Sequence, residues 1–167
     1  MSLCKGFAPV VKNDAEILIL GSMPSVASLA HEQYYAHPQN RFWRLMAKLL
    51  GYAKMPENYP EKLKMLMDNH IALWDAIASC EREGSLDSAI HREIPNDFSE
   101  FLSKYTKINT VCFNGGKAYQ CFKKYNKNIL TNDKYRFYSM PSTSPANARF
   151  KIGMLEDKWK VMLSAPK

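Results

Sequence analysis

The stretch QYYAHPQNRFW, from Gln33 to Trp43, combines four aromatic rings, a His-Pro pair and three carboxamides, and it contains no carboxylate. A carboxamide neither gives up nor takes a proton at neutral pH. Asn40 can therefore only orient and polarise a partner, by donating through its NH₂ group and accepting through its carbonyl oxygen. Pro38 holds the preceding His37 extended, which can aim its imidazole into a pocket. The stretch indicates a site that orients its reactants.

Four short runs have the β-branched and aromatic content of buried strands, and each is followed by a turn signal. They are EILIL (16–20), IALWD (71–75), TVCFN (110–114) and RFYSM (136–140). Apolar residues at helical spacing lie between and after them, within 42–50, 98–105, 119–122 and 155–163, and we expect 51–60 to be a loop. Strands separated by helices imply parallel pairing. The pattern predicts an α/β fold in a single domain, residues 1–167, whose sheet is covered by helices on both faces.

In such sheets, sites form beyond the carboxyl ends of the strands. After the first strand, the turn GSMPS (21–25) can direct backbone N–H groups at an anionic or carbonyl oxygen, or can be an ordinary strand-to-helix turn. After the second strand, the Asp75 carboxylate can accept hydrogen bonds from a base edge; the alternative is a helix N-cap. Both strand ends are candidate walls of a cleft.

The other two strand ends are also polar. NGGK (114–117) has two glycines that allow close backbone approach, but it lacks the spacing of a P-loop, so we do not expect it to bind a nucleoside triphosphate. MPSTSPANARF (140–150) carries three hydroxyls, a carboxamide and Arg149, a composition suited to phosphate contact. A plain surface loop is the alternative for this last segment.

The charge balance favours a polyanionic partner. The chain has 23 Lys and Arg against 16 Asp and Glu, a formal charge of +7, and no block of like charges forms a tail. The four cysteines form no CxxC pair, Cys112 lies in an apolar run typical of a buried thiol, and we expect no metal or cluster. The longest apolar run, 17–20, is too short to cross a membrane, and the N-terminus has no leader pattern, which predicts a cytoplasmic protein.

Five segments occur in a specific order: GSMPS (21–25), QYYAHPQNRFW (33–43), GSLDSAI (84–90) with PNDF (95–98), FNGGKAY (113–119) and MPSTSPAN (140–147). This ordered set, which covers nearly the whole chain, resembles the uracil-DNA glycosylase superfamily and, within it, the hypoxanthine-DNA (deoxyinosine) glycosylase family. FNGGKAY also looks like the corresponding strand end of mismatch thymine-DNA glycosylases. The resemblance implies a three-layer α/β/α sandwich with a short, mostly parallel four-stranded sheet and no metal or organic cofactor. We expect a monomer whose partner is DNA containing deaminated bases.

Two positions depart from better-known branches of that superfamily. Met23 stands where those branches carry the Asp or Asn that handles the catalytic water, and Ser142 stands where some carry a His that stabilises the departing base. In the resembled family the candidate is the Asn of HPQN, which carries over to Asn40. The resemblance therefore implies that Asn40 is the catalytic residue and that it holds a water below the sugar.

The expected site has two further parts. The base-binding pocket is expected to include Gly21, Ser22, Met23, Ser25, Tyr34, Tyr35, His37, Phe42, Asp75 and Asn114. The DNA contacts are expected from Ser85, Ser88, Lys117, Ser142, Thr143, Ser144, Ala146, Asn147 and Arg149. Phe42 begins a helical stripe, so core packing is its alternative, and His37 can instead fix the loop. Related enzymes insert an apolar wedge into the gap that the flipped base leaves in DNA, and in this sequence the wedge position falls on Ala146, which is small. Either Asn147 or Arg149 fills this gap, or the enzyme depends less on a duplex.

These features favour hydrolysis of the N-glycosidic bond of a flipped, deaminated base, with hypoxanthine as the first candidate. Keto bases leave as anions with charge on carbonyl oxygens, and a pocket of donors near residues 22–25 selects them over adenine and cytosine. One alternative is a uracil or mismatch thymine glycosylase, and another is a non-catalytic nucleic-acid-binding module of the same fold. A small-molecule hydrolase or flavodoxin-like carrier agrees less well with the charge and the ordered segments.

Overall fold

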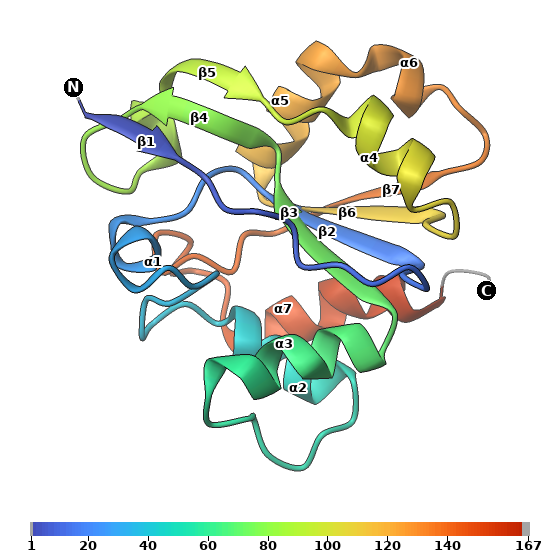
Figure 1. The fold of residues 1–167 in the computed structure, drawn as a ribbon. Coiled ribbons are helices and arrows are strands. Elements are labelled where there is room, and N and C mark those ends of the chain that lie inside the picture. Colours follow the sequence, from blue (N-terminus) through green and yellow to red (C-terminus); the bar gives the residue numbers. More distant parts are fainter. Residues whose placement is uncertain (1, 165–167) are drawn as a thin grey trace.

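A computed structural model describes residues 2–164 of the chain. Its main sheet has four parallel strands in the order β3-β2-β6-β7, crossing the middle of the molecule (Figure 1). The strands are β2 (Ile17–Gly21), β3 (Ile71–Asp75), β6 (Thr110–Asn114) and β7 (Arg136–Met140). The predicted fold class is confirmed, and the first strand lies one residue later than predicted.

Helices cover both faces of this sheet, as Figure 1 shows. One face packs against α2 (Phe42–Leu49), α3 (Tyr59–Asp68) and α7 (Ile152–Trp159), and the other packs against α4 (Phe98–Lys104), α5 (Gly116–Tyr125) and α6 (Lys127–Leu130). Side chains of β2 alternate between the two layers, so Ile19 joins the first core while Leu18 and Leu20 join the second. Burial on both faces explains why the strands are nearly continuous apolar runs.

A second, antiparallel sheet was not predicted. It has the order β1-β4-β5 and consists of β1 (Leu3–Lys5), β4 (Ile77–Glu81) and β5 (His91–Pro95). Ala76 alone separates β3 from β4, so no turn signal marks the boundary between them. The exposed and charged β5 lacks an apolar pattern altogether. The loop predicted at 51–60 is also too long by two residues, because Asn58 caps α3 by accepting from the Glu61 N–H at 2.9 Å.

The remaining short elements are α1 (Val26–His31), the 3₁₀ turn η1 (Asp87–Ala89) and the terminal η2 (Lys160–Ser164). Two of them, α1 and η1, contribute residues to the carboxyl ends of the main strands, and the third, η2, follows α7. Gly21 is in register with Asp75, and Asn114 with Met140, so the four polar strand ends meet at one edge. Within residues 2–164, no helix is long and apolar enough to span a membrane, and no cluster of His, Cys, Asp or Glu could hold a metal. Cys112 is fully buried, as predicted.

Candidate active site

A cleft of about 690 Å³ opens at the edge where the four strands end. It is lined by the turn 21–25, by Tyr34, Tyr35, Asn40 and Asp75, by the loop 85–88, by residues 114–116 and by most of the segment 139–150. All four strand ends singled out in the sequence thus contribute to one concave surface. Concave surfaces of this size at the carboxyl ends of parallel strands are where α/β proteins bind their ligands.

Three of the predicted site residues do not line the cleft: His37, Phe42 and Lys117. The His37 Nδ1 accepts from the Gln39 N–H at 3.1 Å, which fixes the loop. Phe42 is fully buried and stacks on Tyr35, with ring centroids 4.1 Å apart. Lys117 lies in the first turn of α5. The structure therefore agrees with the alternative given for each residue: His37 fixes its loop, and Phe42 packs in the core.

Asn40 lines the cleft in a fixed orientation. Its Oδ1 accepts a hydrogen bond of 2.9 Å from the Phe42 N–H at the start of α2, and its own N–H donates to the His37 carbonyl at 2.9 Å. No acceptor for its Nδ2 is found within the described part of the chain. One lone pair of Oδ1 and the NH₂ group therefore remain for a water molecule or a ligand.

Arg41 connects the Asn40 loop to the segment 143–150. Its guanidinium donates to the carbonyl oxygens of Ser144 (2.7 Å), Asn147 (3.2 Å), Thr143 (3.3 Å) and Phe150. The planar fork of an arginine can serve several carbonyls at once, which a lysine ammonium cannot do with the same geometry. Sequence reasoning assigned no role to this residue, and the only signal was an arginine directly beside Asn40.

The polar groups of the segment 140–150 are largely used to shape it. The Asn114 amide donates to Thr143 Oγ1 and accepts from the Thr143 N–H, both at 3.0 Å, and Asn147 Nδ2 donates to the Ser142 carbonyl at 3.0 Å. Gly115 has φ +95°, and a Cβ there would lie 3.2 Å from the Ser142 Cβ. The structure thus gives Asn114 a role in shaping the cleft wall.

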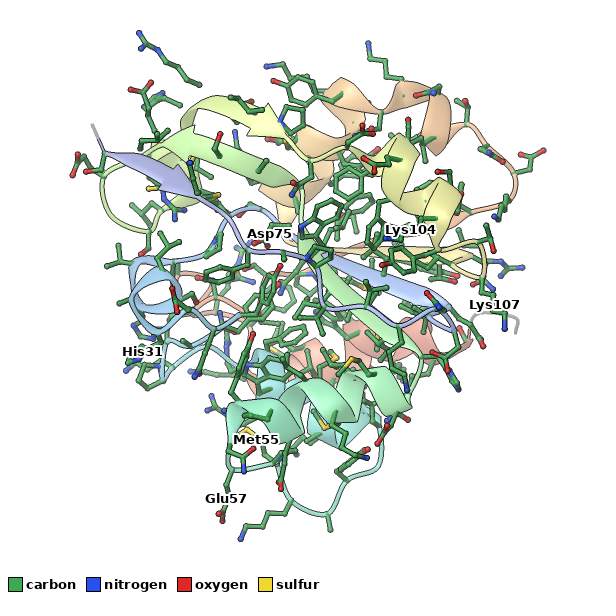
Figure 2. All side chains as sticks on the ribbon, in the orientation of Figure 1. His31, Met55, Glu57, Asp75, Lys104 and Lys107 are labelled. Atoms are coloured by element: carbon green, nitrogen blue, oxygen red, sulfur yellow. The ribbon has the colours of Figure 1, made fainter. Side chains whose placement is uncertain are left out.

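The floor of the cleft contains two buried polar atoms without partners among the described residues, Asp75 Oδ2 and the Tyr35 hydroxyl. Both side chains close around Gly21, where a Cβ would lie 2.5 Å from Asp75 Oδ1 and 2.9 Å from the Tyr35 oxygen. Asp75, labelled in Figure 2, lies in the middle of the molecule between the two sheets. It is followed by β4 and not by a helix, so the N-cap alternative is wrong.

The protonation of this floor follows from its burial. Desolvation, and then the charge of Asp87, raise the pKa of Asp75 to about 7, with a smaller opposing effect from Arg82. Desolvation likewise raises the pKa of the Tyr35 hydroxyl, which stays protonated at every physiological pH. Around neutral pH a large share of Asp75 is therefore a neutral acid that can donate as well as accept.

The turn 21–25 is attached to the loop 82–90. Ser22 Oγ donates to Asp87 Oδ1 at 2.6 Å, and the Val26 N–H donates to Ser85 Oγ at 2.9 Å. The buried Arg82 donates to the carbonyl oxygens of Pro24 and Ser85. In the described residues, the backbone N–H groups of Met23 and Ser25 have no acceptor. This rigid turn therefore offers two unused backbone donors beside the cleft.

Comparison with known proteins identifies the family. Residues 8–162 match the family model described as the uracil DNA glycosylase superfamily. The chain belongs to this superfamily. A curated relative from Methanosarcina acetivorans, named hypoxanthine DNA glycosylase, is 40% identical over 158 residues, which cover 95% of this chain and 96% of the relative. A second of the same name, from Methanosarcina barkeri, is 39% identical over 145 residues, covering 87% and 89%.

A solved structure shares the fold. The solution NMR structure of a candidate uracil DNA glycosylase from Methanosarcina acetivorans superimposes with a TM-score of 0.82 at 39% identity, covering 96% of both chains. The resemblance drawn from the ordered segments is thus confirmed.

The two departures from better-known branches of the superfamily have structural explanations. Met23 is buried and packs with Ile77, Cys80 and Ile90 under the smaller sheet, so its side chain brings no group that could handle water. Ser142 Oγ accepts from the Ser144 N–H at 3.1 Å and shapes its own loop. Neither Met23 nor Ser142 can therefore take over the role that the water-handling residue or the histidine has in other superfamily members. The chemistry must therefore be sought elsewhere in the cleft.

Replacement of Arg41 by Lys should loosen the segment 143–150. The lysine keeps the charge but cannot serve four carbonyls, so we expect a loss of about 2 kcal/mol in the free energy of unfolding. Hydrogen exchange of the amides in this segment should also become faster. Arg44→Lys is the matched control, because Arg44 is exposed and makes one long contact with the Pro38 carbonyl. Equal behaviour of the two variants would refute the role of Arg41.

Replacement of Asp75 by Asn should change the pH dependence of stability. The folded pKa of about 7 lies above the unfolded value of about 3.9. The folded protein therefore holds this proton more tightly, and its stability falls as the pH rises between these values. The Asp75→Asn variant lacks this titration. The difference in the free energy of unfolding, variant minus wild type, should therefore rise by about 2 to 3 kcal/mol from pH 5 to pH 8.

Chemical denaturation at both pH values measures this gain in the Asp75→Asn variant. Asp133→Asn, at an exposed turn position, serves as the control. A difference between wild type and Asp75→Asn that stays constant with pH would show that Asp75 is ionised in the folded protein.

Proposed function

We propose that this member of the uracil DNA glycosylase superfamily is a monofunctional DNA glycosylase that releases a deaminated base, hypoxanthine first, from DNA. The observation that carries the proposal is the oriented Asn40 amide, which lines the same cleft as the unused backbone donors of Met23 and Ser25. Two curated relatives that span most of this chain are named hypoxanthine DNA glycosylase. Such a reaction leaves an abasic site and begins base excision repair.

The proposed catalytic step uses no general base. Water donates a hydrogen bond to the free lone pair of Asn40 Oδ1, which directs a lone pair of the water oxygen toward C1′ of the sugar. The bond between C1′ and the base nitrogen breaks early, and its electron pair leaves with the base. Water oxygen then bonds to the cationic sugar, and its proton passes to solvent or to the departing base. A hard nucleophilic attack would instead need a proton acceptor, which a carboxamide is not.

The departing base carries negative charge that the protein must stabilise. The backbone N–H groups of Met23 and Ser25 belong to a turn already fixed by α1 and by the loop 82–90. One preorganised donor of this kind supplies about 10²- to 10³-fold in rate. Donors of this kind favour hypoxanthine and uracil, whose anions place charge on carbonyl oxygens.

The floor of the cleft suits recognition of a keto base. A neutral Asp75 offers a hydroxyl donor and a carbonyl acceptor, which match the adjacent carbonyl and N–H of a lactam edge. The Tyr35 hydroxyl is a second donor, and its ring can stack on the base while Phe42 supports it from behind. Stacking on an aromatic ring contributes about 1 to 3 kcal/mol per base. The φ of +55° at Tyr35 is strained for a tyrosine, as residues at functional sites often are.

The DNA itself is expected to contact the rims of the cleft. The hydroxyls of Ser85 and Ser88 lie on one rim, and those of Ser142 and Ser144 lie on the other with Arg149. These groups suit phosphate contact, which positions a strand without reading its sequence. Extrusion of the target nucleotide costs a few kcal/mol, least from a mismatch or a single strand.

A uracil glycosylase activity is the second candidate. Its specific support is the solved neighbour at 39% identity, described as a candidate uracil DNA glycosylase. Uracil presents the same adjacent carbonyl and N–H as hypoxanthine, so the proposed floor would bind either base.

Side-by-side cleavage assays test the proposal. Labelled oligonucleotides carrying one hypoxanthine, uracil, adenine or cytosine are incubated with the protein and then cleaved with alkali at abasic sites. We expect strand cleavage at hypoxanthine and none at adenine or cytosine, because amino groups cannot accept from the donors of the pocket. Cleavage at uracil alone would favour the second candidate. If the protein bound DNA but released no base over hours, the alternative of a non-catalytic nucleic-acid-binding module would be supported instead.

A further inference from the structure

One large apolar side chain at the cleft is not explained by folding. Leu86 lines the cleft and is 59% exposed, so it contributes little to any core. A single exposed leucine is common on protein surfaces and needs no function by itself. Leu86 differs because the chain on both sides of it is held in place.

The anchoring comes from the residues next to Leu86. Ser85 Oγ accepts from the Val26 N–H, and Asp87 Oδ1 accepts from Ser22 Oγ, which ties both neighbours to the turn 21–25. The Leu86 carbonyl accepts from the Ala89 N–H at 3.1 Å in η1. The loop therefore presents an apolar side chain to solvent from a backbone with few alternative conformations. Such an arrangement is unfavourable in the free protein and becomes favourable when a partner covers the side chain.

The opposite rim lacks a comparable side chain. Ala146, the expected wedge position, is small, and the Asn147 amide is occupied by the Ser142 carbonyl. Phe150 lines the cleft but packs against the core around α2 and α7. Arg149 lines this rim with the serine hydroxyls, where its charge suits contact with phosphate. Within the described segment 139–150, no large apolar side chain is thus available to enter DNA.

We propose that Leu86 is the wedge that enters the base stack when the target nucleotide is flipped into the cleft. The wedge comes from the loop between β4 and β5, on the rim opposite the segment 140–150. Insertion covers the exposed leucine and replaces the lost stacking, which offsets the cost of extrusion from a duplex. This inference rests on the proposed glycosylase function. It predicts that Leu86 matters for paired substrates and not for single strands, where no stack has to be refilled.

The test compares Leu86→Ala with Ile94→Ala. Ile94 is a matched control because it is also 59% exposed but lies on β5 outside the cleft. Single-turnover release of hypoxanthine is measured from a duplex and from the same single strand. Leu86→Ala should lose about 10- to 100-fold on the duplex, as expected for removal of a buried leucine contact, and less than about 2-fold on the single strand. Leu86→Met should restore most of the duplex rate, and Ile94→Ala should leave both rates unchanged.

Two outcomes would refute the proposal that Leu86 is the wedge. An equal loss on both substrates would make Leu86 part of the cleft wall, and no loss would leave it without a role in flipping. Fluorescence of 2-aminopurine placed beside the lesion measures unstacking even where no base is released. If wild type released no base, the proposed function would fail. A fluorescence rise that then depended on Leu86 would still support the wedge, and a rise unaffected by Leu86→Ala would refute it.

Discussion

The contacts of the Arg41 guanidinium with four backbone carbonyls hold the cleft in its shape. Arg41 directly follows Asn40, so the residue that presents its amide to the cleft is covalently joined to the one that fastens the segment 143–150. Hydrogen bonds from a charged donor are stronger than neutral ones, and a fork of several bonds also fixes direction. The position of Asn40 relative to the opposite wall therefore depends on this arginine. The same principle recurs on the other rim, where the buried Arg82 ties the loop 82–90 to the turn 21–25.

The floor between these walls keeps polar groups unsatisfied. Asp75 Oδ2 and the Tyr35 hydroxyl are buried without partners in the described chain, and Tyr35 also has a strained backbone. Each of these features lowers the stability of the free protein. They become understandable if a bound base supplies the missing hydrogen bonds. A site that relies on oriented neutral groups also agrees with the buried Met23, which leaves the turn 21–25 to act through its backbone.

The sequence predicts the main sheet and most of the cleft well, for a clear physical reason. Strands buried on both faces need continuous apolar runs, and the polar residues that interrupt each run mark the strand end where sites form. Gly21, Asp75, Asn114 and Ser142 were found in this way. The smaller sheet escaped because β4 follows β3 after one residue and because β5 is exposed and charged.

Other parts of the site leave no such pattern. Arg41 and Arg82 donate to backbone carbonyl oxygens. Every residue has such an oxygen, so no particular residue type in the sequence indicates these contacts. Leu86 stands alone in a polar loop, and its significance depends on the anchoring of its neighbours. Phe42 and His37 show the opposite error, since an aromatic ring or an imidazole beside a candidate catalytic residue need not face the ligand. Phe42 supports Tyr35 from the core, and His37 holds its own loop.

The central claim is that the Asn40 amide positions the water that hydrolyses the glycosidic bond. The most direct measurement is the single-turnover rate of hypoxanthine release by wild type and Asn40→Ala, with the affinity for the same DNA measured in parallel. Asn58→Ala controls for loss of a carboxamide that accepts from a backbone N–H at a helix start, because Asn58 accepts from the Glu61 N–H in α3 as Asn40 accepts from the Phe42 N–H in α2. The account predicts that Asn40→Ala loses at least about 100-fold in rate while affinity is retained, and that Asn58→Ala keeps its rate. An unchanged rate in Asn40→Ala would contradict the account and move the chemistry to Asp75.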